Sequence, residues 1–359
     1  MKIARGIPHG RNGLAIVAVV IAILFATLFP AESSRPSAFS WTFALGRRGI
    51  GDAILNFFLF VPLGLAIAWK DRRAVTAAVC GVVLASLIEL AQTVLPGRDP
   101  ALSDIMLNGA GAFAGAFIAR RRRTWAAPDA RSSAILTASS LAVAAAIMTA
   151  TGYLLSPRSG SATRATRQMA LPESPSDGAR DIRSLLTLNV RSSQEPVLVA
   201  RSGNDLLLRY PSAGSAYGLD QPEYWESGFF DGAVSGRSGV VSMSRDRARW
   251  EISIDGARTT MGPTVGKGWA ILAYPDAIGR RWGRSLSAAW LFAMCFPIGF
   301  WARGRGRIVA GAVIVMLLAF IPFGMGVLAT PANEWSGGLV GFLLGAALRE
   351  IVVVRSRRR

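Results

Sequence analysis

The sequence is poor in the residue types that build disulfide frameworks and soft metal sites. Among 359 residues it has two cysteines and one histidine. Cys80 and Cys295 both fall inside apolar segments, so neither a disulfide framework nor a thiolate metal site is indicated. His9 lies in the basic N-terminal tail, which excludes a His-dependent catalytic triad or a His-ligated metal site within this chain. We expect no metal and no other cofactor.

Acidic residues are also scarce, with 22 Asp and Glu against 40 Lys and Arg, which gives a net charge of +18. This charge does not indicate nucleic-acid binding, because the arginines occur in short runs between apolar segments instead of on an interleaved basic and aromatic face. A hydrophobic content of 51% and a mean hydropathy of +0.37 are typical of a polytopic membrane protein that carries some soluble material. The expected partners are membrane lipids, and the oligomeric state is left open.

Long apolar segments predict about eight transmembrane helices. The first, at residues 14–30, follows a basic tail as a signal peptide does, but it is long for one and lacks a small-x-small cleavage site, so we expect a retained helix. At about 1.5 Å per residue, these segments cross most or all of a ~30 Å hydrocarbon core. The other predicted spans are 53–69, 74–95, 104–119, 134–155, 286–302, 307–329 and 336–354.

Basic residues between these segments predict the topology. They cluster in residues 2–11, 70–73, 120–131, 303–307 and 355–359, on alternate sides of the successive spans. The positive-inside rule then places all five clusters and both termini in the cytoplasm, and residues 156–285 outside it. Arg-rich, Lys-poor usage suggests a GC-rich bacterial genome, so the expected location is the bacterial cytoplasmic (inner) membrane.

The extracytoplasmic part has two sections. Residues 156–180 contain many Ser, Pro and Gly residues and are expected to be a flexible linker after a membrane domain at 1–155. Residues 181–276 predict a small antiparallel β-sandwich, with Asp255-Gly256 at a hairpin turn. The predicted strands are 182–190, 196–200, 206–210, 239–243, 250–254 and 269–274. The stretch 250–256 is faintly similar to laminin-G or concanavalin-like folds, and both glycan binding and a purely structural role are open.

The C-terminal helices, residues 286–354, repeat features of the earlier ones. Phe60-Val-Pro62-Leu-Gly64 before a basic cluster returns as Cys295-Phe-Pro297-Ile-Gly299 before another. Four spaced residues also return, Asp104, Asn108, Gly111 and Gly115 as Glu334, Gly338, Gly341 and Gly345. One interpretation is a parallel duplication of three to four helices whose second copy has lost most of its polar face. The other is chance recurrence of Gly and Pro in membrane helices.

Polar residues within the apolar helices 52–119 are the candidate site. Asp52 and Asn56, Glu89 and Gln92, and Asp104 and Asn108 are each three or four residues apart, so each pair shares a helix face. A charge in the hydrocarbon core costs at least about 2.5 kcal/mol, so these acids need a compensating role. We predict a polar pocket in the outer leaflet, with Arg98 pairing the acids; the alternative is a polar clamp that fixes helix register. The predicted pocket residues are Asp52, Asn56, Glu89, Gln92, Arg98, Asp104 and Asn108.

These residues also carry a family resemblance. The ordered set resembles the VanZ-like family of small integral membrane proteins over residues 52 to about 119, and it consists of Asn56, Phe60, Pro62, Gly64, Glu89, Gln92, Arg98, Asp104, Asn108 and Gly111. The resemblance implies a compact bundle of mostly membrane helices and an association with teicoplanin-type antibiotic resistance in the founding member. It supplies no established reaction. The β-domain and the second set of helices depart from the simple family plan.

Three functions follow as hypotheses. The first is a cell-envelope protein whose pocket binds an amphiphile, such as a lipid-linked cell-wall precursor or a lipophilic glycopeptide. The second is a membrane-embedded hydrolase or transferase that acts on a lipid-linked sugar, with Glu89 and Asp104 as the catalytic acids. The third is a proton-coupled transporter, suggested by the repeat and a buried carboxylate.

Overall fold

The computed structural model divides the chain into two compact units, Met1–Pro128 and Asp129–Arg359. The described residues are 10–28, 39, 41, 49–69, 73–95, 100–158, 164–170, 182–189, 196–219, 221–231, 238–272 and 275–357.

The first unit is a helical bundle. It contains α1 (Gly10–Leu28), α2 (Gly49–Ala68), α3 (Ala74–Gln92), α4 (Leu102–Arg120) and the short α5 (Arg122–Ala126). Its core combines large side chains of α2 and α3, such as Phe60, Leu63 and Ile88, with small residues of α4, such as Ala112 and Ala116. The small residues let α4 approach α2 closely, which is how membrane helices gain packing contacts without a hydrophobic driving force.

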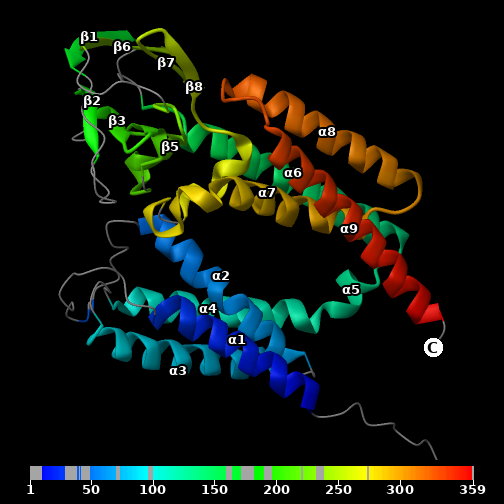
Figure 1. Cartoon of the computed structure of the whole chain (residues 1–359). Coiled ribbons are helices and arrows are strands. Elements are labelled where there is room, and N and C mark those ends of the chain that lie inside the picture. Colours follow the sequence, from blue (N-terminus) through cyan, green and yellow to red (C-terminus); the bar gives the residue numbers. More distant parts are fainter. Residues whose placement is uncertain are drawn as a thin grey trace, which may run out of the picture. The chain divides into compact units, whose positions relative to one another are not determined.

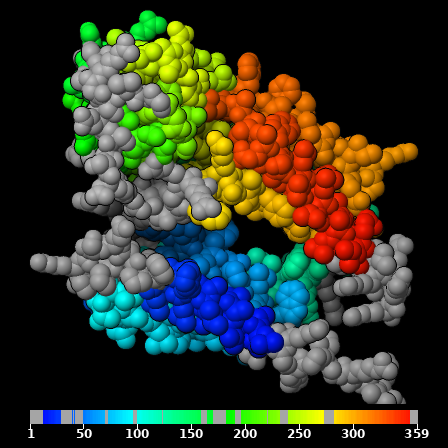
Figure 2. All heavy atoms as spheres, viewed as in Figure 1, coloured from blue at the N-terminus to red at the C-terminus, as the bar shows by residue number. Residues whose placement is uncertain are grey.

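Apolar side chains also cover the outside of this unit. Along α1, Leu14, Val17, Ile21 and Phe25 are 54–71% exposed at helical spacing, and α1 lies on the surface in Figure 2. An exterior of large aliphatic and aromatic side chains is what a lipid-facing helix requires.

The second unit combines a β-sandwich with four long helices: α6 (Ala130–Leu154), α7 (Pro275–Trp301), α8 (Arg305–Met325) and α9 (Ala332–Arg357). One antiparallel sheet has the order β1-β6-β7-β8 and the other β2-β3-β4-β5. Figure 1 shows both sheets beside these helices. The strands are β1 (Arg164–Ala170), β2 (Arg183–Leu188), β3 (Val197–Ser202), β4 (Asp205–Arg209), β5 (Glu223–Glu226), β6 (Ser238–Asp246), β7 (Arg249–Ile254) and β8 (Ala257–Met261).

The inner faces of the two sheets form one core, which confirms the predicted β-sandwich. Alternate residues of facing strands, such as Val199, Leu208, Met243 and Ile252, are buried there. The predicted turn is also present: Asp255 and Gly256 have φ of 49° and 88°, and join β7 to β8. Positive φ at both central residues matches the right-handed twist of a hairpin, so Asp-Gly is favoured at this position.

Two segments differ from their sequence expectation. Residues 164–170, within the expected linker, form β1 and pair with β6 along seven residues. This strand is at the edge of its sheet and is mostly polar, so it lacks the alternating apolar signal. The expected strand at 269–274 instead begins in η2, a 3₁₀-helix at Val265–Ile271. There a Cβ on Gly268 would lie 2.7 Å from the Thr151 hydroxyl, so this close packing against α6 requires a glycine.

Fewer helices qualify as membrane spans than the eight predicted. Among the described residues, five are long and apolar enough: α2 from Ile50, α3, α4, α6 and α8. The apolar part of α1, Gly13–Leu28, is shorter. Helices α7 and α9 have sufficient length, but they place Gly, Trp and charged residues among their apolar ones. Because α7 and α9 bury much of their surface against each other, tertiary contacts replace part of the hydrophobicity that a lipid-exposed span needs.

Helices α7 and α9 nevertheless pack in the same register as α2 and α4. In the first pair, a Cβ on Gly64, Gly111 or Gly115 would lie within 2.0 Å of the carbonyl oxygens of Ala112, Phe57 and Val61. In the second pair, Gly299, Gly341 and Gly345 approach the carbonyls of Phe342, Phe292 and Phe296 in the same way. The α7 positions are 235 residues after their α2 counterparts (64 to 299), and the α9 positions 230 residues after those of α4 (111 to 341). Three equivalent backbone contacts support an internal duplication.

Candidate functional site

A polar cluster joins the first turns of α2 and α4. Asp52 and Asp104 lie in those turns, where the helix dipole favours a carboxylate. The Asp104 carboxylate accepts a hydrogen bond from Ser103 Oγ at 3.3 Å, and it lies close enough to Asn56 and Asp52 to interact with both, repulsively with Asp52. We call Asp52, Asn56, Ser103 and Asp104 the Asp104 cluster. Its two acids and its amide are each half-buried, so they remain accessible from outside the bundle.

Glu89 and Gln92 of α3 have a different role. Glu89 is only 3% exposed, and its Oε2 accepts the backbone N–H of Ala101 at 2.9 Å. Ala101 is the N-cap residue of α4 and has no side-chain acceptor of its own, so Glu89 supplies the cap from a neighbouring helix. Gln92 Nε2 donates to the carbonyl of Thr27 at the end of α1, at 3.0 Å. These contacts fit the polar clamp that was the alternative to a pocket.

Asn108 lies one turn after Asp104 on the same face of α4. Its side chain is 2% exposed, and its Oδ1 has no hydrogen-bond partner within the described part of the chain. A buried polar atom without a partner costs about 1–3 kcal/mol. Asn108 is therefore an acceptor still to be satisfied next to the Asp104 cluster.

The structure does not test the predicted pairing with Arg98. This residue lies at 96–99, outside the described residues. Of the seven predicted site residues, the structure brings Asp52, Asn56 and Asp104 together, with Asn108 one turn away, and gives Glu89 and Gln92 separate partners. Ligand binding by these residues stays a prediction.

Two surface cavities lie away from this cluster. One, of about 290 Å³, is in the first unit and is lined by Pro62, Leu65 and Ala66 of α2, by Trp69 just after it, and by Ala15 of α1. The other, of about 320 Å³, is in the second unit between α6 and α7. Both linings are mainly apolar, as expected for grooves that take lipid chains, and neither contains a residue of the Asp104 cluster.

A second buried carboxylate lies in the other unit. Glu334, in the first turn of α9, is 1% exposed. Its Oε1 accepts the hydroxyl of Thr264, and its Oε2 accepts the backbone N–H of Gly266 at 3.0 Å. Both donors belong to the segment that follows β8, which η2 continues. Glu334 thus anchors the end of the β-sandwich to α9.

Lys267 lies beside this carboxylate. Its ammonium is 4.3 Å from the centre of the Tyr224 ring, which is a cation–π distance. Burial lowers the pKa of Lys267 to about 8, and the opposing attraction of Glu334 is the smaller effect. Lys267 is one of three lysines in the chain.

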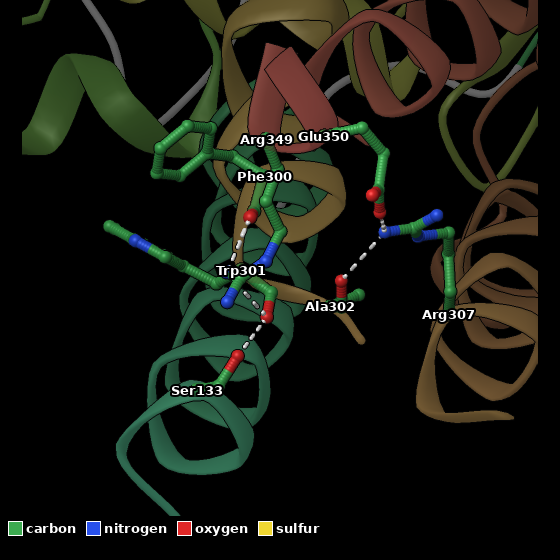
Figure 3. Close-up of polar contacts among 7 residues, drawn as sticks. All are labelled: Ser133, Phe300, Trp301, Ala302, Arg307, Arg349 and Glu350. Atoms are coloured by element: carbon green, nitrogen blue, oxygen red, sulfur yellow. Dashed lines mark hydrogen bonds and ion pairs between the residues drawn. The ribbon is translucent and has the colours of Figure 1, made fainter. Parts of the chain in front are cut away.

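The Arg-rich end of the second unit is held by a buried arginine. Arg349 of α9 is 5% exposed and donates to the carbonyls of Phe300 and Trp301 at 2.9 and 3.4 Å, while Ser133 of α6 donates to the second of these (Figure 3). Arg307 forms an ion pair with Glu350 at 2.7 Å. In the first unit, Arg122 similarly donates to the carbonyl of Trp69 after α2, at 2.6 Å. These arginines satisfy carbonyls at helix C-termini, which is a structural role.

Sequence reasoning missed several of these residues. Ser103, Thr264, Lys267 and Arg349 were not selected. Lys267 had a signal in the rarity of lysine, but Thr264 and Arg349 meet partners roughly 50 or more residues away, which no local spacing reveals. Among the described residues, no group of three His, Cys, Asp or Glu side chains is placed to hold a metal ion.

The class of protein is defined by five apolar helices of membrane-spanning length together with an antiparallel β-sandwich: this is a helical membrane protein with a β-domain. Residues 13–124 match the family model described as VanZ/LLP1. That range covers nearly all of the first unit and about a third of the chain, so the first unit is a VanZ-like membrane domain, and the resemblance carried by the polar residues is confirmed. No curated protein and no solved structure shows a significant match to the chain.

Proposed function

We propose that the VanZ-like unit binds the polar head of an amphiphile at the Asp104 cluster. The observation that supports this most is the meeting of Asp52, Asn56 and Asp104, all half-buried, on an otherwise apolar bundle. Two carboxylates near each other repel, and a bound group that donates hydrogen bonds to both relieves that repulsion. The cluster is thus prepared for a ligand rich in hydroxyl or amide donors.

The surroundings of the cluster favour a ligand with a lipid tail. Leu55 and Phe58 flank Asn56 along α2 and are 42% and 62% exposed. Leu55 is three residues after Asp52, so the two side chains share one face of α2. Polar head contacts therefore lie beside side chains that face lipid, which suits a molecule with both characters.

The second hypothesis, a hydrolase or transferase, has less support. It needs Glu89 as a mobile acid or base, yet the Glu89 carboxylate accepts the N-terminal amide of α4. A carboxylate held as a helix cap is poorly placed to exchange protons with a substrate. The third hypothesis, a proton-coupled transporter, also has less support. Glu334 is the repeat counterpart of Asp104, and its carboxylate already accepts hydrogen bonds from Thr264 and Gly266.

The charge pattern and the family suggest a setting for this binding. We place the protein in the bacterial cytoplasmic membrane, with the basic clusters inside and the β-sandwich outside. In that orientation, the first turns of α2 and α4 face the outer leaflet, where lipid-linked cell-wall precursors and lipophilic glycopeptides meet the membrane. Binding there would link the protein to envelope-stress or antibiotic resistance, and the sandwich would be free to contact glycans.

The test is lipid binding by the full chain in phosphatidylethanolamine and phosphatidylglycerol nanodiscs, measured by native mass spectrometry. The probe is an undecaprenyl-pyrophosphoryl disaccharide-pentapeptide. Asp104→Asn is expected to weaken binding about tenfold or more, since a charge-assisted hydrogen bond is worth roughly 1.5–3 kcal/mol. The matched control is Asp246→Asn, which changes an exposed aspartate at the end of β6. Equal binding by wild type and Asp104→Asn would remove the proposal.

A further inference from the structure

The contacts of the C-terminal helix pair, α7 and α9, indicate what kind of ligand the equivalent N-terminal pair, α2 and α4, binds. The structural repeat relates α2 to α7 by 235 residues and α4 to α9 by 230. Under these shifts Asp104 corresponds to Glu334, and Asp52 corresponds to Ser287. Both counterparts are deeply buried, at 1% and 2% exposed. The groups that bury Glu334 and Ser287 therefore indicate which chemical groups fit the equivalent positions Asp104 and Asp52.

A single segment of the β-domain occupies both counterpart positions. The Thr264 hydroxyl and the Gly266 amide bind the two oxygens of Glu334. The indole N–H of Trp269 donates to Ser287 Oγ at 3.0 Å. All three donors lie in residues 264–269, at η2 and its N-cap. A Cβ on Gly266 would lie 2.4 Å from the Glu334 carboxyl carbon, so the backbone itself rests against the acid.

The second copy has lost the polar residues that surround the acid in the first. Asn56 corresponds to Leu291, which is fully buried in the apolar core of its unit. Asn108 corresponds to Gly338, where the Leu318 side chain fills the space. The C-terminal site is therefore closed and filled by η2.

The first copy keeps its amides and remains accessible. Asp104 accepts a hydrogen bond from Ser103 of its own helix, lies near Asn56 of α2, and is only half-buried. One turn further, Asn108 Oδ1 is buried without a partner among the described residues. The unpaired acceptor is independent of the repeat, and it indicates that a donor is missing on this face of α4.

We propose that η2 is an internal pseudo-ligand, which fills in the C-terminal copy the place that an external ligand takes at the Asp104 cluster. This inference rests on the function proposed above and adds the chemistry of the ligand. The head group presents a hydroxyl and an amide N–H side by side to the Asp104 carboxylate, as Thr264 and Gly266 do to Glu334. A further hydroxyl reaches Asp52, as Trp269 reaches Ser287.

An N-acylated amino sugar carries these groups. Its amide and a hydroxyl lie on adjacent ring carbons, so the ring holds both donors in place and little conformational entropy is lost on binding. A peptide that contains Thr or Ser has the same groups, but it must be ordered when it binds. The acylated sugar is therefore the better candidate.

The test compares matched probes on the full chain in nanodiscs. Three probes are undecaprenyl pyrophosphate with N-acetylglucosamine, with glucose, and without a sugar. The fourth probe is a lipid with an N-acetyl-Thr-Gly head group. N-acetylglucosamine is expected to bind about tenfold more tightly than glucose, because glucose lacks the amide donor. Asp104→Asn should remove this preference, while Asp104→Glu, which keeps the carboxylate, should retain part of it.

Glu334→Gln is the internal control. It should leave the sugar preference unchanged and increase amide hydrogen exchange at Gly266, whose N–H binds Glu334 Oε2. If binding depends on Asp104 but the two sugars bind with equal affinity, the pseudo-ligand inference is wrong and the proposed function is still supported. Tighter binding of the peptide lipid than of either sugar also overturns it. Binding that ignores Asp104 for every probe overturns the proposed function itself.

Discussion

The glycine contacts between helices give the most direct stability prediction. A Cβ on Gly64 would lie 1.9 Å from the carbonyl oxygen of Ala112, and a Cβ on Gly299 would lie 1.9 Å from that of Phe342. Backbone atoms cannot rotate away, so each helix pair must separate by about 1 Å in Gly64→Ala and Gly299→Ala. Overpacking of this kind costs about 1–3 kcal/mol.

A matched control substitution is expected to have the opposite effect on the melting temperature. Gly306 lies in α8, where a Cβ would meet nothing within 4 Å. Alanine is favoured over glycine in a helix by about 1 kcal/mol, so Gly306→Ala should keep or raise the melting temperature. Gly64→Ala and Gly299→Ala should each lower it by several degrees, since 1 kcal/mol corresponds to about 2–4 °C for a unit of this size.

The assay is thermal unfolding of the purified chain in detergent, with all three variants measured under one condition. The two clashing variants test the equivalence of the helix pairs as well as the packing. If both unfold at the same temperature as Gly306→Ala, then the close approach of α2 to α4 and of α7 to α9 is wrong, and the argument from the repeat fails.

Three other changes test particular contacts. Arg349→Met leaves carbonyls at the end of α7 without their donor, so it should lower the free energy of chemical unfolding by about 1–3 kcal/mol. The control Arg305→Met changes an exposed arginine and should have little effect. Equal unfolding midpoints for the two variants would contradict the capping role of Arg349. Glu89→Ala should speed hydrogen exchange at the Ala101 amide about fivefold, since a lost cap costs ~1 kcal/mol. Unchanged exchange would show that α4 needs no cap from α3. The pKa of Lys267 is lowered to about 8 in the folded chain, below its ordinary value of 10.5, so the unfolded chain binds more protons between these values and stability should rise with pH there. The melting temperature relative to Lys267→Met should therefore increase from pH 8 to 10, and parallel curves for the two proteins would refute the shift.

Local patterns in the sequence predicted much of this fold. Apolar length predicted α2, α3, α4, α6 and α8 as spans, and alternation with the Asp-Gly turn predicted the sandwich. The three- and four-residue spacing placed Asp52 with Asn56 on one face of α2, and Asp104 with Asn108 on one face of α4; that these residues form a binding site stays a prediction.

Tertiary contacts account for what could not be predicted. Among the described residues, three of the eight predicted spans do not qualify, because the apolar part of α1 is short and because α7 and α9 place Gly, Trp and charged residues among their apolar ones. The pocket role of Glu89 stays a prediction, and its contact with the N-cap residue of α4 joins two helices, which no spacing within α3 reveals. The partners of Glu334 are nearly seventy residues before it, so the glycine repeat pointed to its position but not to η2.

The most direct measurement of the central claim is photocrosslinking at the Asp104 cluster. A benzophenone side chain at the exposed position Leu55, three residues after Asp52 on the same face of α2, should label the undecaprenyl-linked N-acetylglucosamine, and Asp104→Asn should abolish the product. The same probe at Val83, exposed on α3, should give only weak labelling that does not depend on Asp104. Equal labelling at the two positions, unchanged by Asp104→Asn, would contradict the claim that this cluster binds a lipid head group.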